Sequence, residues 1–243
     1  MNQITKQFRP INTRWMATAA ILASLLTPAL ARAADDKAEQ ERLKESGDVL
    51  KEIITTNPGI PQSILDKAEC VIVLPSVKKA GFIVGAQYGR GAMTCRSGAN
   101  FSGPWSAPIM MRSSGGSFGL QIGGEATDFV LLIMNEQGAR SVMSSKVKIG
   151  GDASAAAGPV GRTTSAETDI IMKAEILSWS RARGVFAGVS LTGSTLRSDD
   201  DANKNVYGKE LNAKQIILQR EVQTPAAGKQ LIALLDKVSP KHM

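Results

Sequence analysis

Residues 70–96, CVIVLPSVKKAGFIVGAQYGRGAMTCR, decide the fold of this chain. Apolar runs at residues 70–74 and 81–86 are separated by residues 75–79, and a third run follows at residues 89–95. Aliphatic and β-branched residues bounded by Pro and Gly are typical of buried strands. The stretch therefore predicts a compact antiparallel unit. Its net charge is positive, because it contains lysines and arginines but no Asp or Glu.

The segments around this unit predict further strands in the middle of the chain and helices at both ends. Strands are expected at residues 107–112, 117–122, 128–134, 170–180 and 185–192, the last two as a hairpin. Helices are expected at residues 35–56, 61–69, 135–144, 199–207, 213–222 and 225–238. Several glycines between residues 115 and 124 indicate tight turns or bulges. The predicted fold class is α+β, with a curved, largely antiparallel sheet or barrel-like core and N-terminal and C-terminal helices.

Residues 1–33 have the three-part form of a secretory signal peptide. Basic residues precede an apolar run at residues 15–30, and Ala31-Arg32-Ala33 fits a cleavage site after Ala33. Loss of the four basic residues in this segment lowers the formal charge from +7 to about +3. The expected organisation is a signal peptide at 1–33, a helix at 34–59, a domain at 60–210 and C-terminal helices at 211–243. The mature protein is expected to be periplasmic or secreted.

The two cysteines, Cys70 and Cys95, lie on neighbouring predicted strands. Paired thiols persist as disulfides in oxidising compartments, so export favours a bridge between them. Such a bridge would contribute about 3.5 kcal/mol through the entropy of the unfolded chain. Two buried thiols are the alternative.

Three short motifs favour no catalytic or metal site. Gly115 to Gly119 has the spacing of a serine-hydrolase turn around Ser117, but the only histidine, His242, is the second-last residue of the chain. Asp199 to Glu210 imitates a calcium loop, but Lys204 occupies the position that needs glycine. The glycines of residues 150–161 fit no nucleotide motif, and close backbone packing explains them as well. We therefore predict a protein that is not an enzyme and has no cofactor or metal.

The remaining functional signal is a set of basic residues at predicted turns and strand ends, where their side chains could converge on an anionic surface. Scattered solvated charges are the alternative. Nucleic-acid binding is not expected, because aromatic residues are few and are not interleaved with the cations. The candidate lipid-headgroup contacts are Lys78, Lys79, Arg90, Lys146, Lys148, Arg162, Arg181 and Arg183.

From residue 60 to residue 208 the chain resembles the SYLF domain family. The resemblance rests on IPQSILDKAECVIVLPSVKKAGFIVG from residue 60, YGRG at 88–91, GPWSAP at 103–108, FGLQIGGEATDFVLLIMN at 118–135, GGDASAAAGPVGR at 150–162 and SWSRARGVFAGVSLTGSTL at 178–196. Members occur in eukaryotic membrane-trafficking and actin-patch proteins and among bacterial exported proteins. The resemblance implies a non-enzymatic module that binds phospholipids, and actin in some members.

The expected function is binding of an anionic phospholipid membrane at the cell envelope. Export would separate the protein from cytoplasmic actin and phosphoinositides, so actin is expected to be an unlikely partner. The alternative is a structural or protein-interaction module of the envelope, with self-association as one form of it.

Overall fold

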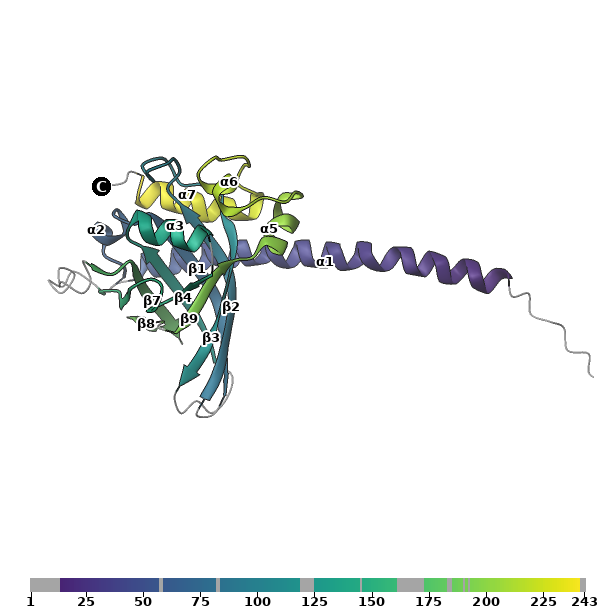
Figure 1. Cartoon of the computed structure of the whole chain (residues 1–243), viewed down its shortest axis with the longest axis horizontal. Helices are drawn as coiled ribbons and strands as arrows, with labels where there is room; N and C mark the ends of the chain where they lie inside the picture. Colours follow the sequence, from purple (N-terminus) through teal and green to yellow (C-terminus); the bar gives the residue numbers. More distant parts are fainter. Residues whose placement is uncertain are drawn as a thin grey trace, which may run out of the picture.

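The structure is a computed structural model, and it describes residues 14–56, 59–81, 84–118, 125–144, 146–160, 173–182, 185–189, 191 and 193–240. A strongly curled sheet forms the half-barrel core, and helices from both ends of the chain lie beside it (Figure 1). This arrangement confirms the predicted α+β class.

The sheet is organised around the hairpin that the opening stretch predicts. β1 (Cys70–Gly81) pairs antiparallel with β2 (Val84–Cys95) and with β4 (Glu125–Ile133), and β2 pairs with β3 (Ile109–Phe118). The order along the sheet is β5-β9-β3-β2-β1-β4-β7-β6, and β8 also pairs with β7. The outer strands are β5 (Val147–Lys148), β6 (Ala155–Ala157), β7 (Ile176–Ala182), β8 (Val185–Gly188) and β9 (Ser194–Ser198). Among the described strands only the β6–β7 pairing is parallel.

A bulge, not a turn, follows the first apolar run, residues 70–74, within β1. The register of β1 shifts between Leu74 and Val77 against β4, and Ser76 has a positive φ of 49°. Pro75 has no N–H to donate to a ladder, which makes a bulge favourable at this point. The N–H of Ser76 instead donates a 2.8 Å hydrogen bond to Asp128 Oδ1. The strand therefore continues past Pro75 and the hairpin becomes longer than the sequence predicts.

The inner face of the half-barrel packs on two short helices. α3 (Glu136–Ser144) and α6 (Ala213–Ile217) place Val142, Ile216 and Ile217 against strand residues such as Ile72. Asn135 caps α3, because its Oδ1 accepts the N–H of Gly138 at 2.8 Å. A capping box between Asn212 and Gln215 begins α6.

The outer face of the sheet packs on helices from the two ends of the chain. α1 (Arg14–Thr55) and α7 (Lys229–Val238) bury Leu43, Leu50 and Leu235 completely, together with residues of α2 (Gln62–Leu65) and α5 (Asp200–Tyr207). Each fully buried aliphatic side chain contributes about 1.5–3 kcal/mol. The predicted amphipathic faces of the terminal helices are thus what holds them on the sheet.

The helix α1 extends well beyond the sheet towards its N-terminal end (Figure 1). It includes part of the predicted signal peptide as well as the predicted helix at residues 34–59. Within the described part of the chain, no helix combines the length and the apolar character needed to cross a membrane.

Other elements differ from the prediction in their bounds or were missed. β6 and β9 were not predicted, since runs of three and five residues give too little periodicity to recognise. Residues 117 and 118 end β3 and do not begin a separate strand, while residues 119–124 lie outside the described part. The hairpin of β7 and β8 is present, although β7 begins at Ile176.

The small residues of the 150–161 segment allow close packing against an aromatic ring. A Cβ on Gly158 would lie 2.0 Å from Trp179 Cε2, and Trp179 donates its Nε1–H to Pro159 O at 3.0 Å. Trp179 is fully buried. This observation supports the structural interpretation of these glycines over phosphate binding.

Cys70 and Cys95 are register partners at the start of β1 and the end of β2, and they form a disulfide. Next to it, the fully buried Arg96 lies with its guanidinium carbon 4.3 Å from the centroid of Trp105. Arg96 Nη2 and Trp105 Nε1 both donate to Ser239 O, at 2.9 and 3.0 Å. This cluster fixes the chain just after α7 to the disulfide end of the sheet.

Candidate anion-binding face

A single cross-strand row brings cations from distant parts of the sequence to the outer face of the sheet. Lys78 on β1 is the register partner of Tyr88 on β2, which pairs with Ser114 on β3. Ser114 pairs with Thr195 on β9, and Thr195 pairs with Lys148 on β5. Directly paired residues point to the same side of a sheet. The register therefore places Lys78 and Lys148 on one face, four strand spacings or roughly 19 Å apart.

This row lies beyond the area that the helices cover. Lys78, Ser114 and Lys148 are exposed, and Tyr88, at 50%, is the one large hydrophobic side chain that is exposed in the described part. Lys146, just before β5, is exposed as well. Neither Lys78, Lys146 nor Lys148 has an ion-pair partner among the described residues. We call the surface formed by Lys78, Tyr88, Ser114, Thr195 and Lys148 the cationic row.

A second row, two residues further along each strand, consists of arginines. Arg90 pairs with Arg112, and Arg112 pairs with Arg197, again on the outer face. Arg197 is exposed, whereas Arg90 and Arg112 are each 27% exposed. Arg197 was not among the predicted contacts, because its strand was not predicted.

Arg90 is neutralised by two carboxylates. Its Nη2 lies 2.6 Å from Glu39 Oε1 on α1 and 3.1 Å from Asp199 Oδ2, just before α5. Both carboxylates have side chains only 4% exposed. Burial raises the pKa of Glu39 above its usual value, and the attraction of Arg90 only partly offsets this effect. The geometry makes Arg90 a structural link between sheet and helices.

Arg181, on β7, is also paired with two carboxylates. It donates to Asp128 Oδ2 from Nη2 at 2.5 Å and from Nε at 3.1 Å, and its Nη1 contacts Glu52 of α1. These groups line a hollow of about 200 Å³ that also contains Glu45 and Asp48. The surroundings of Arg181 are therefore acidic.

The other predicted contacts do not join the cationic row. Lys79 follows Lys78 in an extended strand and so points to the inner face, where its Nζ lies 5.4 Å from the ring centroid of Phe129. Arg162 and Arg183 lie outside the described residues. Of the eight predicted residues, the structure brings Lys78 and Lys148 into one row and places Lys146 beside Lys148.

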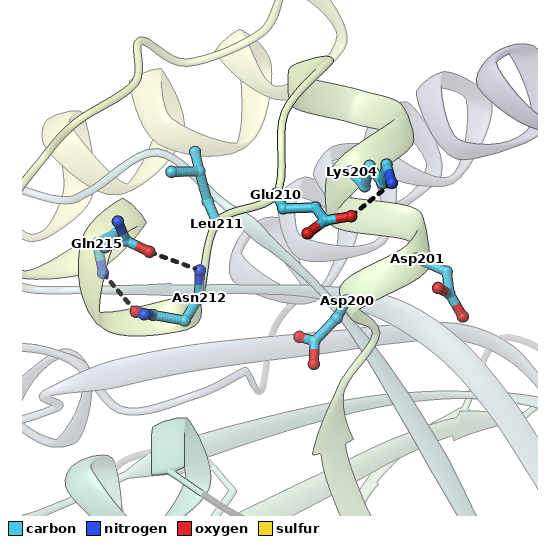
Figure 2. A pocket seen from close by; sticks show the side chains of 7 residues that line it. All are labelled: Asp200, Asp201, Lys204, Glu210, Leu211, Asn212 and Gln215. Atoms are coloured by element: carbon cyan, nitrogen blue, oxygen red, sulfur yellow. Dashed lines mark hydrogen bonds and ion pairs between the residues drawn. The ribbon is translucent and has the colours of Figure 1, made fainter.

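A larger hollow of about 400 Å³ lies between α5 and α6 (Figure 2). It is lined by Asp200, Asp201 and Glu210, among other residues, and Lys204 reaches Glu210 Oε1 at 2.5 Å. Figure 2 shows the carboxylates of Asp200 and Asp201 pointing away from each other. In the described part of the chain, no group of three or more His, Cys, Asp or Glu side chains could hold a metal ion.

The serine-hydrolase spacing does not correspond to a nucleophile turn. Residue 117 is the register partner of Gly85 within β3, so it lies in a ladder and not between a strand and a helix. His242 is outside the described residues.

The fold that carries this face is a strongly curled sheet with helices from both ends of the chain (Figure 1). A family model for Ysc84, described as "Las17-binding protein actin regulator", matches residues 114–238, just over half of the chain. The chain belongs to this family, which is the SYLF family that its motifs resemble. That description characterises the family as one of actin regulators.

Curated relatives from yeasts and vertebrates are similar to most of this chain. An SH3 domain-containing protein of Schizosaccharomyces pombe is 36% identical over 180 residues, which are 73% of this chain and 41% of the relative. SH3 domain-containing YSC84-like protein 1 of Xenopus laevis is 32% identical over 206 residues, 82% of this chain and 60% of the relative. Protein YSC84 of Saccharomyces cerevisiae is 31% identical over 202 residues, which are 79% of this chain and 42% of the relative. The chain thus spans about half the length of these relatives.

The family description corrects one expectation from the sequence. The predicted signal peptide led us to regard actin as an unlikely partner, and that expectation is wrong, because the family is characterised as one of actin regulators.

Proposed function

We propose that this protein is a non-catalytic module that binds membranes rich in anionic phospholipid through the cationic row. The observation that carries the proposal is the register that aligns Lys78, Tyr88 and Lys148 on one exposed face without carboxylate partners in the described part. Basic residues near an anionic surface each contribute about 1 kcal/mol. An amphipathic tyrosine suits the boundary between headgroups and acyl chains.

The test is co-sedimentation of the full chain with phosphatidylcholine vesicles, with and without phosphatidylglycerol. Binding should require the acidic lipid and weaken with salt, because a Debye length of about 10 Å at 0.1 M screens surface charge. The double variant Lys78→Gln/Lys148→Gln should bind roughly 30-fold more weakly, from the loss of about 2 kcal/mol.

The matched control is Lys229→Gln/Lys237→Gln, which removes two exposed charges from α7 and leaves the row intact. Equal binding to neutral vesicles, or equal losses in the two double variants, would contradict the proposal. Light scattering in lipid-free buffer distinguishes self-association, the alternative role in the envelope, from lipid binding.

We also propose export of the mature chain after cleavage behind Ala33. The supporting observation is the basic, apolar and small-residue order of residues 1–33. N-terminal sequencing of the protein purified from its native cells should begin at Ala34. An intact Met1 would contradict export through this segment.

A second candidate function is binding to a protein of the actin system, which the family description favours. Co-sedimentation of the full chain with actin filaments, in the absence of lipid, tests it. Filament binding that Lys78→Gln/Lys148→Gln leaves unchanged would assign actin and lipid to different surfaces.

A further inference from the structure

Two neighbouring strands place two arginines and two hydroxyl residues in a square on the outer face. Arg112 and Ser114 stand on β3, and their register partners Arg197 and Thr195 stand on β9. Lys148 adjoins Thr195 from β5. Adjacent strands lie about 4.8 Å apart, and alternate residues along one strand about 7 Å apart. The donors of all five side chains therefore surround one small area.

Most of these donors make no hydrogen bond to the described part of the chain. The side chains of Arg197, Ser114 and Thr195 have no hydrogen-bond partner in the described part of the chain, and all three are exposed or half-buried. Arg112 Nη2 is 3.6 Å from Asp199 Oδ1, which is too far for a hydrogen bond. Its buried Nε has no partner among the described residues either.

The local charge balance also favours an additional anion. Like charges directly opposite each other on a sheet destabilise it, and Arg90, Arg112 and Arg197 are consecutive partners. Glu39 and Asp199 both lie closest to Arg90. Asp152 is near Lys148, but its Oδ2 accepts the backbone N–H of that residue. Asp199 is shared between Arg90 and Arg112, and no ion pair among the described residues includes Arg197.

We propose that this square, formed by Arg112, Ser114, Thr195 and Arg197, binds a terminal phosphomonoester. Guanidinium groups hold phosphate oxygens in pairs, and two hydroxyls and Lys148 add donors for the remaining oxygens. A monoester carries between one and a half and two negative charges at neutral pH, which matches two arginines better than the single charge of a diester. This inference rests on the proposed function for its lipid form, and the same chemistry would accept a soluble monoester.

The first experiment compares two vesicle preparations with equal surface charge at pH 7.5. One contains phosphatidic acid, whose headgroup is a phosphomonoester, and the other contains phosphatidylglycerol, a diester, both in phosphatidylcholine. We expect the full chain to bind the phosphatidic acid vesicles about tenfold more tightly, a difference typical of one additional charged hydrogen-bonding contact. Equal affinity for both preparations overturns the inference.

Arg197→Gln is the test variant, because Arg197 takes part in no described ion pair and its loss leaves the link at Arg90 intact. It should abolish the tenfold preference. Lys78→Gln removes the same charge from the same face outside the square, so it should weaken binding to both vesicles and keep the preference. A preference that survives Arg197→Gln, or that Lys78→Gln also abolishes, contradicts the site.

Titration of inorganic phosphate into lipid-free protein, followed by amide NMR shifts, separates the two sources of the ligand. Shifts at Ser114, Thr195 and Arg197 without vesicle binding would support the site with a soluble ligand and reject the membrane function. Vesicle binding without a preference for phosphatidic acid would keep the membrane function and reject the phosphomonoester site.

Discussion

Arg90 on β2 donates a 2.6 Å hydrogen bond to Glu39 on α1, and so a predicted lipid contact is instead a link between the sheet and the N-terminal helix. The same guanidinium reaches Asp199 before α5 at 3.1 Å. The guanidinium of Arg90 thus joins β2, α1 and the start of α5, which are far apart in the sequence.

Replacement of Arg90 should affect stability more than lipid binding. Arg90→Gln leaves Glu39 buried without its closest cation and leaves Asp199 with Arg112 alone, 3.6 Å away. Loss of one partner of a buried ion pair costs about 3–5 kcal/mol. Because Arg90 is 27% exposed, we expect about 2–3 kcal/mol in the free energy of unfolding, measured with urea. Lys78→Gln is the matched control, with a change below about 0.5 kcal/mol. Similar stabilities of both variants would contradict the structural role.

The buried carboxyl of Glu69 should make stability depend on pH. Burial raises its pKa to about 7, repulsion from Glu136 adds to the rise, and attraction to Arg96 opposes it. A raised carboxyl pKa means that the folded state binds the proton more tightly. The protonated carboxyl of Glu69 therefore stabilises the folded state fully when the pH is below the pKa of an unfolded-chain glutamate, about 4.3. This stabilisation is lost as the pH rises through about 7.

We expect Glu69→Gln, which stays neutral, to gain stability relative to the wild type as the pH rises. The difference in unfolding free energy between the two should grow by roughly 3 kcal/mol from pH 4 to pH 8. Urea unfolding across this range measures it. If the unfolding free energies of the wild type and Glu69→Gln changed in parallel with pH, the raised pKa of Glu69 would be contradicted.

The disulfide should stabilise the fold by restricting the unfolded chain. Cys70→Ala/Cys95→Ala should lower the free energy of unfolding by about 2–4 kcal/mol. Dithiothreitol under denaturing conditions should produce a similar loss in the wild type and none in the variant. A variant as stable as the oxidised wild type would mean that the bridge contributes nothing.

Gly158→Ala should disturb the packing of Trp179. The added methyl group would stand 2.0 Å from Cε2 of the ring, so either the ring or the backbone must move. Overpacking of this kind costs about 1–3 kcal/mol. The shift should appear in the thermal midpoint and in tryptophan fluorescence. Gly116→Ala, where the nearest atom is 3.9 Å away, should leave both unchanged.

Much of the fold could be predicted because its signals are local. The apolar runs of β1 and β2, the cap at Asn135 and the hairpin of β7 and β8 each depend on neighbouring residues. The bulge at Ser76 was missed because a chain that leaves and re-enters a ladder resembles a turn in the sequence. β9 was missed because five residues give too little periodicity, and with it Arg197 and Thr195 were lost from the candidate site.

The sequence by itself determined the family, the class of fold and, up to the bulge at Ser76, which side of its strand each residue of β1 takes, because side chains alternate along an extended chain. The bulge shifts that alternation, so only the structure decided that Lys78 and not Lys79 lies on the outer face. Only the tertiary structure decided which cations remain available to a ligand. Whether a charge is neutralised depends on what segments from elsewhere in the chain bring against it. Glu39 and Asp199 occupy Arg90, and Glu52 and Asp128 occupy Arg181, while Lys78 and Lys148 lie where no described helix covers the sheet.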